Sequence, residues 1–234
     1  MEWGKVKTIL IISFLFLNLL LGYQLFESRL EIFSLVSDEA AEEVKALLRE
    51  KGIEVKQEIP KETPNVREIS IRYRTRPSSG ERKSLTEPIP VDLEESRWRD
   101  PLKKYIPELD EYAVDRVLSG STQFVLNQTF NGLPMFQVQI VLYLENGEIT
   151  GYTRSYAEVE PFLDQKEQPA LSAYRVVQFL AENRLKDGAV IEEIALGYHG
   201  QLFNSDTQVL APKWRITMEN GDVYYVHAIS GELE

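Results

Sequence analysis

The two histidines, His199 and His227, are the first residues to test for chemistry, because imidazole can serve as a metal ligand or as a general base. His199 stands near the end of one predicted strand and His227 inside another, and the sequence has no cysteine and no H-x-x-x-H pair. Zinc sites need several such ligands at short spacing. The pattern predicts a structural or surface role for both histidines, and it indicates neither a metal nor a cofactor.

Carboxylates offer the other possible chemistry, since glycosidases use a pair of them. Two adjacent pairs occur, Glu94-Glu95 and Glu192-Glu193. Adjacent side chains in a strand point to opposite faces, which is poor geometry for a concerted acid pair. No G-x-S-x-G or Walker pattern occurs either. We predict that the protein is not an enzyme, and a hydrolase whose carboxylates are brought together by folding stays as an alternative.

Residues 8–26, TILIISFLFLNLLLGYQLF, carry no charge. As a helix they would span about 28 Å, close to the hydrocarbon thickness of a bilayer. The segment is longer than the apolar region of a typical signal peptide and lacks an A-x-A-like cleavage site, which favours a retained anchor. Lys5 and Lys7 precede it, so we expect residues 1–7 in the cytoplasm and everything after Phe26 outside the cell membrane.

One face of this predicted transmembrane helix is suited to binding a neighbouring helix. Asn18 is the most polar side chain deep in the apolar run, and its amide can satisfy its hydrogen bonds there only with another polar group. Gly22 would permit close approach of a second helix. At helical spacing the face comprises Ile11, Phe14, Leu15, Asn18, Gly22 and Leu25. The alternative is a single amide tolerated without a partner.

Charge excludes several kinds of partner. The formal net charge is −11, and residues 1–29 contribute +1 from three basic and two acidic residues, so −12 belongs to the remainder. An acidic body of this kind is not expected to bind nucleic acid or anionic lipid. Without cysteine there is no disulfide, and stability must come from packing.

Residues 27–90 predict a helix and two strands. A helix is expected over 38–51, with Ser37 as N-cap and Gly52 as its end. Strands are expected at 53–59 and 66–74, and residues 75–90 predict a loop or domain boundary. Arg72, Arg74 and Arg76 share one face of the second strand. That face is either solvated or a basic docking stripe.

A repeat organises the rest of the chain into two α-β-β-β units, residues 91–165 and 166–234. LYLENGEITGY (142–152) matches ITMENGDVYYV (216–226), and Asn-Gly between strands predicts a type I′ turn. The first unit is expected to have a helix at 110–118 and strands at 122–130 and 135–144. The second is expected to have a helix at 172–183 and strands at 190–198 and 208–218. The fold class is therefore α+β, with helices on one face of antiparallel β-meanders.

Several segments resemble the YycI (WalI) family of Gram-positive bacteria. They are the opening M-E-W-x-K-x-K-T-I-x-I-I, the lone Asn18, the exit Gly22-Tyr23-Gln24-Leu25, NGLPMFQVQIVLYLENGEITGY, and PKWRI with ENGDVYYVHAISGEL. The resemblance implies a regulator that acts with a YycH-like protein on the sensor histidine kinase YycG (WalK), which controls cell-wall metabolism. It supplies no catalytic residues. The C-terminal unit also resembles PepSY modules, so the alternatives are an exported inhibitor or chaperone of a peptidase, or a cell-wall hydrolase.

Overall fold

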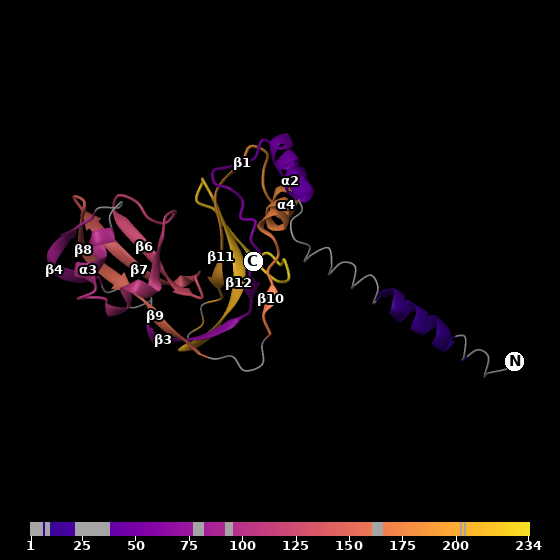
Figure 1. Cartoon of the computed structure of the whole chain (residues 1–234), viewed down its shortest axis with the longest axis horizontal. Coiled ribbons are helices and arrows are strands. Elements are labelled where there is room, and N and C mark those ends of the chain that lie inside the picture. The colour runs from indigo at the N-terminus through magenta and orange to yellow at the C-terminus, as the bar shows by residue number, and fades with distance from the viewer. Residues whose placement is uncertain are drawn as a thin grey trace.

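The computed structural model describes residues 7, 10–21, 38–76, 82–91, 96–160, 166–201, 203 and 205–234. Residues 10–21 are helical. The remaining elements, drawn in Figure 1, are α2 (Asp38–Glu50), β1 (Glu54–Val55), β2 (Asn65–Val66), β3 (Ile69–Thr75), β4 (Lys83–Pro90), η2 (Ser96–Trp98), α3 (Arg99–Leu102), η3 (Pro107–Glu111), β5 (Tyr112–Asp115), β6 (Gln123–Phe130), β7 (Leu133–Glu145), β8 (Glu148–Arg154), β9 (Tyr156–Glu160), β10 (Gln168–Pro169), α4 (Ala173–Asn183), β11 (Val190–His199), β12 (Thr207–Met218) and β13 (Val223–His227).

The first unit differs in extent from the predicted 91–165, because β4 joins its sheet, and it is described at residues 82–91 and 96–154. Its antiparallel strands have the order β5-β6-β7-β8-β4. Alternate residues are buried along β7, as strand periodicity requires, whereas residues 124–128 of β6 are all buried. The short helical turns η2, α3 and η3 contribute to one core with these strands. Its buried side chains include Trp98, Leu102, Ile106, Leu109, Phe124, Leu126, Ile140 and Leu142.

The second unit comprises α2 and β1 together with residues 166–201 and 205–234, and it contains the antiparallel meander β11-β12-β13. Helices α2 and α4 pack together, and their apolar residues share one core with β11, β12 and β13. Trp214 on β12 is buried in that core, and its Nε1 donates a hydrogen bond to the Leu171 carbonyl oxygen (2.9 Å). The apolar stripe predicted for residues 172–183, Tyr174, Val177, Leu180 and Ala181, is fully buried here.

Strands β3 and β9 connect the two units (Figure 1). The start of β12 pairs with β3, and β3 pairs with β9, which follows β8. β7 also meets β11 at one parallel pair, Met135 with Tyr198. A small third core containing Ile69, Ile71 and Leu210 fills the junction. The described strands of both units therefore belong to one continuous sheet, apart from the separate pair β2 and β10.

Both long helices of the body begin and end as predicted where the described residues allow a test. In α4, Ser172 is the N-cap, and its side chain accepts a hydrogen bond from the Arg175 N–H. α2 ends at Gly52, whose φ is +63°. The Ile53 N–H then donates to the Leu48 carbonyl oxygen (2.8 Å), closing the last turn. Ser37 lies outside the described residues.

The Asn-Gly turns are confirmed in the first unit and differ in the second. Asn131 with Gly132, and Asn146 with Gly147, all have positive φ, as a type I′ turn requires. In the second unit Gly221 has a φ of +89°, whereas Asn220 is not in the left-handed region. The Asn220 side chain accepts a hydrogen bond from the Asp222 N–H instead (3.0 Å).

Three predictions of secondary structure were wrong. Residues 110–118 form the end of η3 and then β5, because Tyr112 and Asp115 are buried by pairing with β6. Residues 83–90, predicted as loop, form β4, which pairs only with β8; an edge strand tolerates the prolines Pro88 and Pro90. The strand predicted at 53–59 contains only Glu54–Val55, because its pairing with β11 stops where β11 becomes irregular after Ile191.

Candidate partner-binding site

The predicted helix-binding face is described at four of its six positions. Ile11, Phe14, Leu15 and Asn18 lie in the helical residues 10–21, where a spacing of three and four residues places them on one side. The three apolar side chains are 59–63% exposed. No helix that could cross a membrane was found among the described residues. Residues 8, 9 and 22–26 of the predicted span, including Gly22 and Leu25, lie outside them.

The arginine face of β3 is present, and each of its cations is paired. Arg72 donates to Glu160 (2.6 Å) and Arg74 to Glu158 (2.7 Å), both on β9, while Arg76 is paired with Asp206. The hydrogen bond that Arg74 donates to Glu158 raises the pKa of Arg74 and lowers the pKa of Glu158. The stripe is therefore compensated by acids of the same molecule, which favours the solvated interpretation over a free basic surface.

The histidines lie near the end of the chain. His199 stacks on Tyr225 with 3.9 Å between ring centroids, and its Nδ1 is 3.2 Å from a Glu234 carboxylate oxygen that also binds Lys213. Burial lowers the pKa of His199, and the Lys213 ammonium adds to this shift. His227 accepts N–H bonds from Ile229 and Ser230 (3.2 Å each) and so shapes the last turn. Among described residues no three acids or histidines are grouped to bind a metal.

The carboxylate pair Glu192-Glu193 is divided between two cations. A Glu192 carboxylate oxygen lies 3.7 Å from Lys56, while Glu193 is bound by Arg215 (2.6 Å). Sequence adjacency therefore does not produce an acid pair. Glu94 and Glu95 lie outside the described residues.

A buried ion cluster joins the two units, and sequence reasoning missed it. Arg215 on β12 donates hydrogen bonds to Asp115 on β5 (2.6 Å) and to Glu193. The side chain of Arg215 is only 5% exposed, and that of Asp115 is 0% exposed. The Arg215 guanidinium also lies 4.2 Å above the Phe136 ring.

The electrostatics of this cluster favour the charged forms. Burial works against ionisation of Asp115, but its hydrogen bonds with Arg215 and Asn127 outweigh burial, and its pKa is lowered. Burial also opposes the charge on Arg215, but the hydrogen bonds that it donates to Asp115 and Glu193 raise its pKa in spite of this. Asp115 and Arg215 are separated by 100 residues, so no local sequence pattern predicts that they pair. The available signal was an acid and an arginine, each within a mostly apolar strand.

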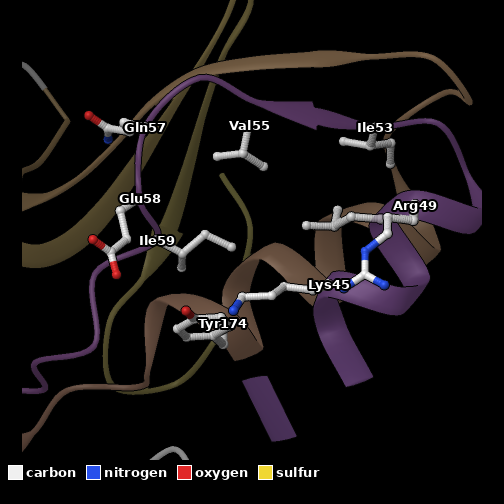
Figure 2. A pocket seen from close by; sticks show the side chains of 9 residues that line it. Lys45, Arg49, Ile53, Val55, Gln57, Glu58, Ile59 and Tyr174 are labelled. Atoms are coloured by element: carbon white, nitrogen blue, oxygen red, sulfur yellow. The ribbon is translucent and has the colours of Figure 1, made fainter. Parts of the chain in front are cut away.

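A small groove opens between α2, the β1 segment and α4 (Figure 2). Its volume is about 280 Å³, and the buried side chains of Ile53, Ile59 and Tyr174 form its apolar floor. Lys45 and Arg49 line its α2 side, and both lie near Glu42, at 2.8 and 3.5 Å. A groove of this size can accept one apolar side chain of a partner.

The described residues define the class of the body as α+β, with helices packed against antiparallel strands. The chain belongs to the YycI family, because the sequence model of the YycI protein matches residues 78–229. That family consists of regulatory accessory proteins of the YycG (WalK) two-component system and is not known to be enzymatic.

One solved structure that the chain resembles is the crystal structure of an uncharacterized protein from Eubacterium rectale. The two share 12% sequence identity with a TM-score of 0.41, over 62% of this chain and 57% of that one. The chain thus spans little more than half the length of that protein. The comparison with curated proteins gives no match.

Proposed function

We propose that this protein is a non-enzymatic, single-pass membrane regulator that acts with a YycH-like partner on a YycG (WalK) sensor kinase. In this proposal the N-terminus is cytoplasmic, residues 8–26 span the membrane, and the body lies outside. Family membership supports the two-component system, and the cluster of exposed apolar side chains at residues 10–21 supports a membrane contact. The exposed apolar side chains are the main support for the proposed mechanism, because soluble proteins rarely expose a large contiguous apolar surface to water.

Regulation in this scheme passes through the helix. In this proposal, contacts between helices within the membrane transmit the effect to the cytoplasmic side of the kinase. Asn18 can bond a polar group of a neighbouring helix, and such a bond contributes about 1 kcal/mol. Small-residue packing at Gly22 adds close van der Waals contact.

The test replaces both groups in the full chain. Asn18→Leu with Gly22→Leu should reduce co-purification with the kinase and the YycH-like protein by about fivefold or more, given that a bond of ~1 kcal/mol is lost together with close packing. Kinase autophosphorylation should change as well. Ser13→Leu is the matched control, because it also replaces a polar residue by leucine but lies on the opposite side of the helix. If replacing the span by an unrelated apolar anchor left kinase output normal, the helix would only attach the protein to the membrane and would not transmit regulation.

Orientation can be tested separately, since the chain has no cysteine of its own. A single cysteine at the exposed Asn220 should react in intact cells with a membrane-impermeant maleimide, whereas one at Lys7 should react only after lysis. The reverse labelling pattern would overturn the proposed topology. The result of the Asn18 and Gly22 replacements would still test helix binding independently.

A further inference from the structure

A second cavity, larger than the groove of Figure 2, opens in the first unit between the β5–β6 connection and the end of the β7–β8 hairpin. Its volume is about 810 Å³, within the range of small-molecule binding sites. The rings of Trp98 and Phe124 line it, with 6.3 Å between their centroids, and Leu144 lies at its side. Val114, 37% exposed, presents further apolar surface at this cavity.

The charge of this cavity is opposite to that of the protein. Two arginines, Arg99 and Arg116, line it, and none of the other described residues that line it is charged. Arg99 donates to the backbone carbonyl oxygens of Leu109 and Tyr112 (3.2 and 3.0 Å). These acceptors are neutral, so they hold the guanidinium in place without cancelling its charge.

Arg116 is exposed, and no ion pair or hydrogen bond of its side chain occurs within the described part of the chain. By contrast, Arg72 and Arg74 on β3, and Arg76 just after it, are each matched by an acid. In a chain with 37 acidic and 26 basic residues, two arginines without a described carboxylate partner at one apolar cavity are a distinct electrostatic feature.

We propose that this cavity binds a small amphiphilic carboxylate, with a compact apolar body against Trp98 and Phe124 and its carboxylate on Arg116. The planar guanidinium fork of arginine matches a carboxylate in a bidentate geometry. The net charge of −11 disfavours polyanions, because each additional negative charge on a ligand is repelled by the whole protein. The site does not depend on the proposed kinase partnership.

The experiment uses the full chain in zwitterionic nanodiscs, labelled with 5-fluorotryptophan, and 2-naphthoate as the probe. The ¹⁹F resonance of Trp98, assigned by Trp98→Phe, should shift in a saturable manner. The resonance of Trp214, buried in the other unit, should stay in place and serve as an internal control. Neutral 2-naphthamide has the same apolar body and should bind about tenfold more weakly, because it cannot form a charge-assisted bond.

Two variants separate the contributions of charge and space. Arg116→Gln should weaken 2-naphthoate about tenfold and leave 2-naphthamide unchanged, whereas the exposed Arg184→Gln in the second unit should change neither. Gly120→Phe should abolish binding of both probes by filling the cavity. A Cβ at Gly120 meets no atom within 4 Å, so the fold should be retained.

Equal affinities for the acid and the amide, or unchanged affinity in Arg116→Gln, would overturn the proposal. So would a Trp98 resonance that does not respond to 2-naphthoate, or a response that persists in Gly120→Phe with an unchanged melting temperature.

Discussion

In the second unit, residues of α2 and α4, two helices of more than ten residues, share a core with the β11-β12-β13 meander. In the first unit, Trp98 of η2, Leu102 of α3 and Leu109 of η3 share a core with the β6-β7-β8 meander instead. The two units thus share a similar arrangement of strands but differ in the helical segments packed against them. A strand meander needs apolar side chains packed on one face, and either long helices or short helical turns can supply them. The looser cover of the first unit is where the 810 Å³ cavity occurs.

The cluster that joins the units should give the largest effect on stability. Asp115→Ala leaves Arg215 buried with only one of its two carboxylates, and breaking a buried ion pair costs about 3–5 kcal/mol. Chemical denaturation of the full chain measures this loss. Asp110→Ala is the control, because Asp110 pairs with Lys103 at the surface of the same unit (2.9 Å) and should cost much less. Equal losses would show that the buried cluster is not the principal junction.

The same cluster predicts a pH dependence. The pKa of Asp115 is lowered from its ordinary value of 3.8, chiefly because its bonds with Arg215 and Asn127 outweigh burial. A carboxyl whose folded pKa lies below its unfolded pKa stabilises the protein fully above the unfolded value, and this stabilisation is lost as the pH falls through the folded pKa. Asp115→Asn should therefore flatten the acid limb of the stability curve below about pH 4. A slope equal to that of the unmodified chain would contradict the assignment.

The elements predicted correctly were those fixed by local chemistry. The helix expected over 172–183, the helix end expected at Gly52 and the strand expected over 135–144 all depend on residues near them in the chain. The errors arose where the secondary structure depends on contacts with residues distant in the sequence. Residues 110–118 have helical spacing, but pairing with β6 and the contact of Asp115 with Arg215 make them η3 and β5.

The candidate site was predictable to a smaller extent. The apolar face around Asn18 follows from composition and helical spacing alone. Arg72 and Arg74 lie on one exposed face of β3, as predicted, whereas Arg76 follows the end of the strand. The partners of Arg72 and Arg74 on β9 come from more than 80 residues away. The arginine cavity of the first unit depends on Arg99 and Arg116, which no sequence pattern connects.

The turns offer a test of how far the repeat extends. Gly147→Val and Gly221→Val should each cost about 1–3 kcal/mol in thermal or chemical denaturation, because a β-branched residue is forced to positive φ. A Cβ at either glycine meets no atom within 4 Å, so the loss reports the backbone conformation alone.

The preceding asparagines should separate the two turns. Asn146 has a φ of +52°, so Asn146→Gly should be neutral or slightly stabilising. Asn220→Gly should destabilise by about 0.5–1 kcal/mol, because the bond to the Asp222 N–H is lost. Identical responses at both positions would mean that the turns are of the same type after all.

Helix capping contrasts the units at a smaller scale. Ser172→Ala should lower the free energy of unfolding by about 1 kcal/mol, since the first turn of α4 loses a side-chain acceptor. Trp98, at the corresponding position of α3, forms no such bond. Ser84→Ala, on an exposed position of β4, is the control and should change stability by less than about 0.5 kcal/mol. Equal effects of both serine replacements would show that the Ser172 cap does not stabilise the protein.

The smallest effect is expected between β3 and β9, where Arg72 and Glu160 form a half-exposed pair. A double-mutant cycle with Arg72→Gln and Glu160→Gln should give a coupling of about 0.2–1 kcal/mol, because solvent screens the charges and two long side chains lose freedom. The coupling should fall as salt is raised, since the Debye length shrinks to about 3 Å at 1 M. A coupling as large and as insensitive to salt as that expected for Asp115 with Arg215 would mean that this connecting sheet, and not the buried cluster, holds the two units together.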